Sequence, residues 1–151
     1  VQRLEKNWCE YFDVKHSVSV NSATSGLIAA VGAIGIEPGD EIITTPTTMT
    51  ATSASILIYH GIPIFADICP NTFCIDPKDV ERKITEKTKA ILAVNIYGET
   101  ANWDELRRIA NDHNLKLIED AAQSAGGEYN GKKSGTLGDI GIFSLNRHKL
   151  I

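Results

Sequence analysis

The stretch that decides the fold is residues 90–120, which read AILAVNIYGETANWDELRRIANDHNLKLIED. Residues 90–96 form an almost continuous apolar run, which predicts a buried strand. Residues 102–113 carry apolar side chains at helical spacing on one face, which predicts an amphipathic helix. Residues 115–118 predict the next strand. A strand, a helix and a strand with short connections are typical of a parallel α/β sheet.

The same alternation continues on both sides of this unit. We expect further helices over residues 4–12, 27–31, 50–59 and 77–84, and further strands over residues 17–20, 41–45, 62–66 and 140–144. Pro63 indicates that its strand lies near an edge of the sheet, because proline cannot donate a ladder hydrogen bond. Asp76-Pro77 has the residue types that begin a helix. The pattern predicts one α/β domain with a mainly parallel sheet and helices on both faces.

Composition and charge exclude several classes of protein. The chain has 151 residues, of which 42% are hydrophobic and 23% charged, close to the averages of soluble globular domains. Disordered and collagen-like chains are therefore excluded. The net charge of −4 and the absence of a basic run give no reason to expect nucleic acid or an anionic membrane as a partner. No apolar run approaches the length of a membrane span.

The cysteines and the two ends of the sequence indicate where the protein works and how long it is. Cys9, Cys69 and Cys74 form no C-x-x-C pair, so neither a zinc site nor a redox motif is expected. Sparse reduced thiols are typical of the cytoplasm. The sequence has no initiator Met or signal peptide and stops after Ile151, so we expect both ends to lie inside a longer protein.

Candidate functional residues follow the predicted strands, because ligands of parallel sheets bind beyond the carboxyl ends of the strands. Residues 21–26 open a helix with Ser and Thr hydroxyls, which suits either an anion site or an ordinary N-cap. Asp120 ends an apolar strand and could face a protonated cofactor nitrogen, or it could cap the next helix. Glu119 beside it is expected to point elsewhere and to be structural. Neither a P-loop nor a dinucleotide fingerprint is present, so a plain nucleotide-binding domain is disfavoured.

Lys149 is the candidate for a Schiff-base lysine, because a lysine in a crevice can become a nucleophile when its pKa is lowered. Arg147 and His148 are neighbouring groups that could lower it. The alternative is a solvated basic cluster. Lys132 and Lys133 lie in a glycine-flanked turn, and we expect both to be solvated.

Together these segments resemble the DegT/DnrJ/StrS-type pyridoxal-phosphate sugar aminotransferases, which have the aspartate-aminotransferase (type I) fold. The resemblance covers almost the whole chain and rests on residues 18–27, 35–43, 65–68, 88–91, 97–98, 118–124, 135–139 and 143–149. It implies a three-layer α/β/α arrangement around a mainly parallel mixed sheet. It also implies that residues 1–151 are part of the large cofactor-binding domain, without the smaller C-terminal domain.

The resemblance implies three residues around the ring of pyridoxal 5′-phosphate. Lys149 matches the lysine that holds the cofactor as a Schiff base and then acts as the general acid/base of the proton shift. Asp120 matches the aspartate that keeps the pyridine nitrogen protonated, so that the ring accepts electrons. Gln123 matches a residue near the phenolic oxygen of the ring.

The resemblance also implies a phosphate site, and here the chain departs from the family at two positions. Thr24 and Ser25 match the phosphate-binding turn, and Ser144 matches a phosphate-contacting serine. The family usually stacks an aromatic residue on the ring where this chain has Met49, whose thioether can pack on a ring face. Ala23 replaces a glycine, which raises the question of whether that position needs a positive φ.

The implied activity moves an amino group from an amino acid, expected to be glutamate, onto a nucleotide-linked keto sugar. The product would feed a surface polysaccharide, an O-antigen or a glycoside, and the full-length protein is expected to be a homodimer. Two alternatives stay open: a pyridoxal-phosphate sugar dehydratase and a non-catalytic regulatory relative. Such dehydratases carry His at the Schiff-base position, where this chain has Lys149.

Overall fold

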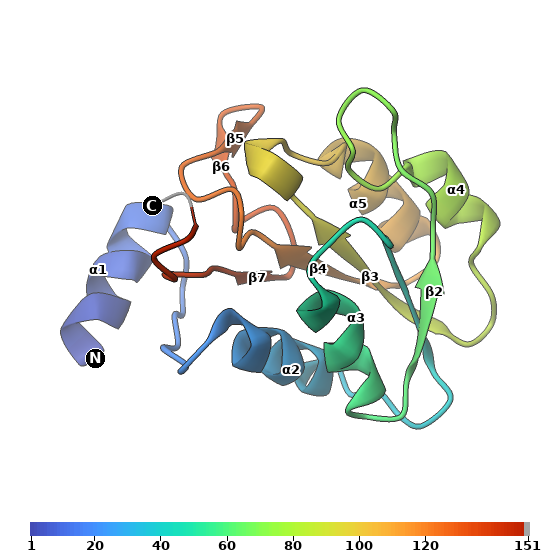
Figure 1. Ribbon diagram of the computed structural model, residues 1–151, viewed down its shortest axis with the longest axis horizontal. Coiled ribbons are helices and arrows are strands. Elements are labelled where there is room, and N and C mark those ends of the chain that lie inside the picture. Colours follow the sequence, from blue (N-terminus) through green and yellow to red (C-terminus); the bar gives the residue numbers. More distant parts are fainter. Residues whose placement is uncertain (150–151) are drawn as a thin grey trace.

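The computed structural model describes residues 1–149, and it is built around one parallel sheet (Figure 1). The strands are β1 Glu41–Thr44, β2 Ile62–Phe65, β3 Thr88–Val94, β4 Lys116–Asp120 and β7 Ile140–Ile142. Their order across the five-stranded sheet is β2-β1-β3-β4-β7, and every neighbouring pair is parallel. The predicted α/β class is therefore confirmed.

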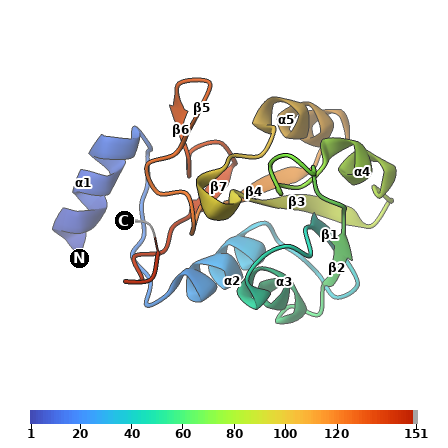
Figure 2. The same ribbon diagram turned by 45° about the horizontal axis from the view of Figure 1, so that its top comes forward.

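Helices cover both faces of this sheet (Figure 2). One layer holds α2 Ala23–Ala33 and α3 Thr50–Leu57, and the other holds α4 Pro77–Arg82 and α5 Trp103–Asp112. The reason is the right-handedness of crossover connections. The chain runs outward from β1 to β2 and then back across β1 to β3 and β4, so α3 falls on one face and α4 and α5 on the other.

The core lies along the central strand, as the apolar run in the sequence predicts. From Ala90 to Val94 every residue of β3 is at most 1% exposed, because strands flank it on both sides and helices cover both faces. Pro63 lies on β2 at the edge of the sheet, so that prediction is confirmed as well. The Asp76 carboxylate accepts a hydrogen bond from the backbone N–H of Lys78 at 3.0 Å and caps α4, with Pro77 at its first position.

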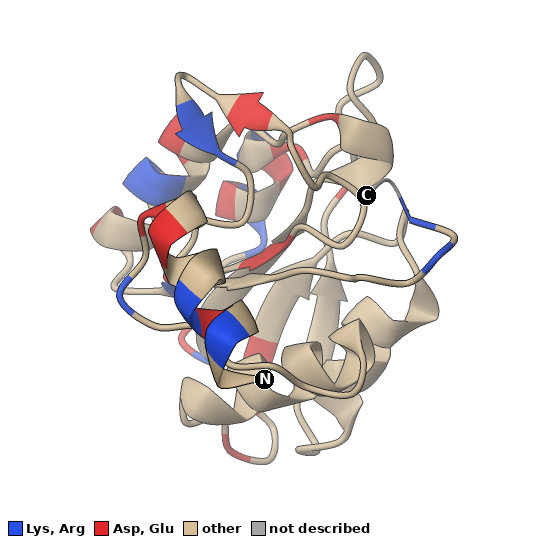
Figure 3. Cartoon of the chain, turned by 90° about the vertical axis from the view of Figure 1, so that its left-hand side faces the viewer, with Lys and Arg blue, Asp and Glu red and all other residues tan. Residues whose placement is uncertain are grey.

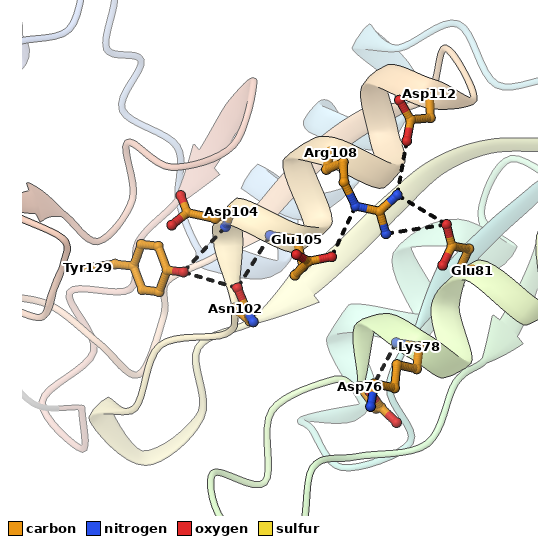
Figure 4. A network of polar contacts seen from close by, with 9 residues as sticks. All are labelled: Asp76, Lys78, Glu81, Asn102, Asp104, Glu105, Arg108, Asp112 and Tyr129. Atoms are coloured by element: carbon orange, nitrogen blue, oxygen red, sulfur yellow. Dashed lines mark hydrogen bonds and ion pairs between the residues drawn. The ribbon is translucent and has the colours of Figure 1, made fainter.

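The two helices of the second layer are joined at their surface by Arg108 of α5 (Figure 4). Its guanidinium donates to Glu81 of α4 at 3.3 Å, and to Glu105 and Asp112 of α5 at 3.0 Å each. These side chains are about half exposed, so the ion pairs add little stability. Arg108 thus links α4 and α5, the helices that follow β2 and β3, at the protein surface.

The strand expected over residues 17–20 is wrong. This segment runs in an extended line between α1 Gln2–Phe12 and α2, and it is not part of either sheet. The backbone N–H of Ser19 instead donates to Glu5 Oε1 at 2.7 Å, and Val18 is 78% exposed. Alternating β-branched residues favour extended backbone, but a strand also needs a neighbouring strand.

A short hairpin is an element that the sequence analysis missed. β5 Glu128–Tyr129 pairs with β6 Lys132–Lys133 across Asn130 and Gly131, which both have positive φ, 50° and 77°. An Asn-Gly pair is the usual turn of such a hairpin. Lys132 is exposed as expected, but the expectation for Lys133 is wrong: its Nζ lies 3.8 Å from the ring centre of Tyr11 and donates to the Tyr11 carbonyl.

That contact attaches α1, which stands apart from the three layers (Figure 1). Trp8 and Phe12 of α1 pack on Phe143, with ring centres 5.1 and 4.7 Å apart. The first helix therefore covers the segment that follows β7. Among residues 1–149, no helix combines the length and the apolar character that crossing a membrane requires.

Candidate active site

The strand order creates a topological switch point at the carboxyl edge of the sheet. β1 and β3 are neighbours, yet the chain leaves β1 toward β2 and leaves β3 toward β4, so the two following loops diverge. In open α/β sheets such a switch point is where ligands bind. The loop before α3 and the short helix η1 Ile96–Gly98 begin here.

Asp120 is the last residue of β4 and lies one strand away from this switch point. It pairs with Val94 of β3 on one side and with Ile142 of β7 on the other. Its side chain is nearly inaccessible, at 4% exposed. One oxygen, Oδ2, accepts a hydrogen bond from Thr52 Oγ1 at 2.9 Å, and Oδ1 accepts one from the backbone N–H of Ala122 at 3.1 Å.

The charge of Lys149 acts on the Asp120 carboxyl. Burial raises the pKa of the Asp120 carboxyl, while the Ala122 N–H, the Thr52 hydroxyl and the positive charge of Lys149 oppose that rise. The alternative of a helix cap fails, because residues 121–124 form a turn and no helix follows β4 directly. Asp120 is thus a buried carboxylate at a strand end that serves no helix.

Thr52 is a site residue that the sequence analysis missed. It is fully buried in α3, and its hydroxyl lies 2.8 Å from that of Thr48 one turn earlier. The signal in the sequence was a pair of hydroxyl residues four apart at the start of a helix that follows a strand. Met49 occupies the position before α3 and is 58% exposed, so its thioether is accessible.

The start of α2 carries the hydroxyls expected to bind phosphate. Ser22 is the N-cap: its Oγ accepts from the backbone N–H of Ser25 at 3.2 Å, so the capping interpretation applies to this residue. The Ser25 hydroxyl donates to Asn21 Oδ1 at 2.6 Å, and Thr24 is exposed. Ala23 is the first residue of the helix and has no positive φ, so the glycine of the family is not needed there.

The segment after β7 brings the remaining predicted residues to the same edge. Ser144 is 8% exposed and its Oγ accepts from the backbone N–H of Asn146 at 3.4 Å. The backbone N–H of Lys149 donates to the Asn146 carbonyl at 2.8 Å, and the Lys149 residue is half-buried. Arg147 and His148 are exposed, so they lie on the outside of this turn.

A glycine lets the start of α2 pack closely on the end of β7. A Cβ at Gly26 would lie 3.1 Å from Ile142 Cγ2, so the first turn of α2 packs closely on the end of β7. Ser25 directly precedes Gly26, and Ser144 follows Ile142 by two residues. Gln123 is half-buried in the turn after β4, directly beyond Asp120. Within residues 1–149, no group of three or more His, Cys, Asp or Glu side chains is placed to bind a metal ion.

Comparison with curated proteins gives close relatives over the whole chain. It is 40% identical over 151 residues to a GDP-perosamine synthase from Caulobacter vibrioides, covering 100% of this chain and 41% of that protein. It is 44% identical over 145 residues to a pleiotropic regulatory protein from Geobacillus stearothermophilus, covering 96% of this chain and 39% of that protein.

Solved structures share the same fold. An aminotransferase from Psychrobacter cryohalolentis superposes with a TM-score of 0.96 at 34% identity, covering 98% of this chain and 38% of that one. The E. coli GDP-4-keto-6-deoxy-D-mannose-3-dehydratase, with bound hydrated PLP, superposes with a TM-score of 0.89 at 31% identity, covering 94% of this chain and 38% of that one. This chain therefore spans between 38% and 41% of the length of these proteins.

These comparisons confirm the resemblance and, with it, the type I fold. The family model that matches describes the DegT/DnrJ/EryC1/StrS aminotransferases, and the match runs over residues 1–151. The match over residues 1–151 shows that the chain belongs to the DegT/DnrJ/EryC1/StrS aminotransferase family, and the parallel sheet and the buried carboxylate at the end of β4 agree with it.

Proposed function

We propose that this protein is a pyridoxal-phosphate-dependent aminotransferase that moves an amino group from an amino acid onto a nucleotide-linked keto sugar. The observation that carries the proposal is the buried Asp120 carboxylate, held by Thr52 at the carboxyl edge of the sheet and under the influence of the Lys149 charge. A buried carboxylate needs a compensating partner. A protonated ring nitrogen would be such a partner.

The residues present fit this cofactor. A carboxylate can accept about four hydrogen bonds. Asp120 accepts hydrogen bonds from Thr52 and Ala122, so acceptor capacity remains for a ring N–H. The residues that would hold the cofactor are Asp120 at the ring nitrogen, Gln123 near the phenolic oxygen, Met49 on the ring face, Thr24, Ser25 and Ser144 at the phosphate, and Lys149 as the covalent attachment.

The proposed division of labour follows from where these side chains lie. When bound, the cofactor supplies the electron sink and carries the amino group between the two substrates. Asp120 keeps a proton on the ring nitrogen, and Thr52 favours the ionised form of the Asp120 carboxylate by donating to it. Lys149 moves the proton at the reacting carbon as general acid and base.

Exposure favours the aminotransferase over the dehydratase. Of the last two described residues, Lys149 is half-buried and His148 is exposed. The charge of Lys149 also acts on the Asp120 carboxyl, and a lysine, unlike a histidine, can hold the cofactor as a Schiff base. The finer assignments belong to the same proposal: glutamate as donor, a role in surface polysaccharide or glycoside synthesis, a homodimer in the cytoplasm, and a further C-terminal domain in the full-length protein.

One experiment tests the reaction. The full-length protein is incubated with pyridoxamine phosphate and a panel of nucleotide-linked keto sugars, and formation of the amino sugar is followed by mass. We expect amine on at least one sugar. A regulatory relative, which the Geobacillus protein's name brings to mind, would aminate none. A dehydratase would release water from the sugar and leave no amine on it.

A second experiment tests the lysine. Borohydride reduction of the cofactor-loaded protein should fix the cofactor on the peptide that contains Lys149. Lys149→Ala should abolish this label, whereas Lys132→Ala is the matched control, because Lys132 is an exposed lysine of the β5–β6 hairpin. A label on any other lysine contradicts the assignment.

A further inference from the structure

The residue next to Asp120 contacts a different part of the molecule. Glu119 is fully buried, and because side chains alternate along a strand, it lies on the opposite face of β4 from Asp120. Burial raises the pKa of the Glu119 carboxyl, and the hydrogen bonds that it accepts oppose the rise. Burying a carboxylate costs free energy unless hydrogen bonds compensate for the lost water. The proposed chemistry gives Glu119 no role.

The donors to Glu119 come mainly from the turn that leads into β7. Its Oε1 accepts from the backbone N–H of Gly135 at 2.5 Å, and its Oε2 accepts from those of Leu137 at 2.7 Å and Gly138 at 3.3 Å. Three backbone N–H groups of one turn therefore converge on one side chain. A carboxylate can accept all of these hydrogen bonds because both of its oxygens are acceptors. The NH₂ group of an amide would instead face a backbone N–H, which is also a donor.

Two side chains complete this network, Asn95 after β3 and Ser134 at the start of the turn. Asn95, which follows β3, donates from Nδ2 to Glu119 Oε1 at 2.7 Å, and Ser134 Oγ donates to the same oxygen at 3.1 Å. Asn95 Oδ1 accepts from Trp103 Nε1 at 3.0 Å. Ser134 Oγ lies 2.6 Å from Ser124 Oγ. Glu119 thus ties the turn to the loop after β3 and to the turn after β4.

The turn lies directly on β7. A Cβ at Gly141 would overlap the Gly135 carbonyl, and a Cβ at Gly135, which has a φ of 89°, would overlap the Phe143 ring. The turn, Gly141 and Phe143 are therefore stacked without room for a further carbon. Fixing the turn on Glu119 fixes β7 underneath it.

β7 needs such fixing because its own pairing is short. It is an edge strand of three residues, and it pairs with β4 only at Ile140, Gly141 and Ile142. In a strand, a slip of one residue turns every side chain to the other face. Ile142, the last residue of β7, pairs with Asp120, and the segment that carries Ser144 and Lys149 starts from there, so where it starts relative to Asp120 depends on the register of β7.

We propose that Glu119 is a positioning residue that locks the register of β7 on β4 and thereby places Ser144 and Lys149 opposite Asp120. The link to Lys149 rests on the proposed function, whereas the lock on β7 is independent of it. β4 then has a division of labour between its faces: Asp120 faces the cofactor site, and Glu119 holds the strand that supplies the other site residues.

The test uses Glu119→Gln in the full-length, cofactor-loaded protein. The amide keeps the shape of the side chain but sets its NH₂ against backbone N–H groups. We expect faster hydrogen exchange in peptides that contain residues 139–144, and less visible absorbance from lysine-bound cofactor. A displacement of Lys149 by about 1 Å should lower kcat by about 100-fold with little change in the KM for the sugar.

Asp79→Asn is the matched control. Asp79 is another buried carboxylate, in α4, and its Oδ2 accepts from the backbone N–H of Asp67 at 2.6 Å, just after β2 at the opposite edge of the sheet. It should destabilise the protein and leave exchange over residues 139–144, absorbance and kcat as in the wild type. If both variants change these readouts equally, Glu119 is merely structural and the inference fails.

A milder variant covers the case in which Glu119→Gln does not fold. Ser134→Ala removes one donor and leaves the carboxylate, and it should raise exchange over residues 139–144 to a smaller extent. Wild-type exchange there in Ser134→Ala, or in a folded Glu119→Gln, overturns the lock. If the wild type itself carries no cofactor on Lys149, the proposed function fails, while the exchange data still decide the role of Glu119.

Discussion

Of the two residues joined by the hydrogen bond from Thr52 to Asp120, only Asp120 could be identified from the sequence. Asp120 could be found from the sequence because a carboxylate at the end of an apolar strand needs a partner. Thr52 could not be assigned, because it comes from α3 after β1, and β3 lies between β1 and β4 in the sheet. Only the strand order puts the two side chains together.

Asp120→Asn should leave a folded protein with very low turnover. The amide keeps the shape and can still accept from Thr52, but it carries no charge to hold a proton on the ring nitrogen. Breaking a buried ionic partnership costs about 3–5 kcal/mol, which corresponds to a kcat about 10²- to 10⁴-fold lower. Steady-state rates and cofactor content of the full-length variant check this. Wild-type rates would return Asp120 to a structural role.

Thr52→Val should move the pH profile. The change removes a donor that favours the ionised carboxylate, so the pKa of Asp120 rises further and the acidic limb of kcat shifts to higher pH. A hydrogen bond to a charged group is worth about 1.5–3 kcal/mol, so the acidic limb should move by about 1–2 pH units. Thr50→Val, at the exposed first residue of α3, is the control. An unchanged pH profile in Thr52→Val would show that Thr52 has no effect on the ionisation of Asp120.

Whole elements were predictable where burial alone decides them. β3 and α5 follow from an apolar run and an apolar stripe, since both patterns report a surface that must be covered. The strand predicted over residues 17–20 was wrong because strand pairing depends on a neighbouring strand, which the local sequence does not reveal. The β5–β6 hairpin was missed although Asn130-Gly131 signals it, because strands of two residues have no periodicity to detect.

The N-terminus of α4 gives a prediction at the scale of one element. The backbone N–H of Asp67 and the Arg82 guanidinium lower the pKa of Asp79. Because this pKa is lower in the folded state, the stabilisation is present above the ordinary Asp value of about 3.9 and is lost as the pH falls through the folded value. Asp79→Asn should therefore lower the free energy of unfolding by about 1.5–3 kcal/mol at pH 7, and the difference should shrink in acid. Urea titrations at pH 7 and pH 3 measure it, and a constant difference would contradict this account.

The charges of the molecule as a whole are unevenly distributed (Figure 3). α1 carries acidic and basic side chains together, whereas the sequences of α2 and α3 contain no charged residue. The net charge of −4 is thus borne by the other segments. The uncharged layer is also the one whose helices begin at the candidate site, so a phosphate there would meet N–H groups and hydroxyls rather than carboxylates.

Removing the cofactor should lower the stability of the whole protein. A ligand that binds only the folded state adds about 2.7 kcal/mol at 100 times its Kd. We therefore expect the Tm of the full-length protein to fall when a carbonyl reagent strips the cofactor, and to recover on its return. Lys149→Ala should lose most of this difference, because the covalent attachment is gone. A Tm that does not respond to pyridoxal phosphate would contradict the proposed cofactor.

The docking of α1 has a consequence for how the protein is made. Lys133, which binds the Tyr11 carbonyl, comes 122 residues later in the chain, and Phe143 comes later still. At roughly 5–20 residues per second, α1 leaves the ribosome on the order of 10 s before its docking surface is synthesised. An isolated helix of 11 residues is marginal in water. We expect nascent chains to expose Trp8 and Phe12 to chaperones throughout this interval, and cross-linking on stalled ribosomes should show the contact ending once Phe143 has emerged.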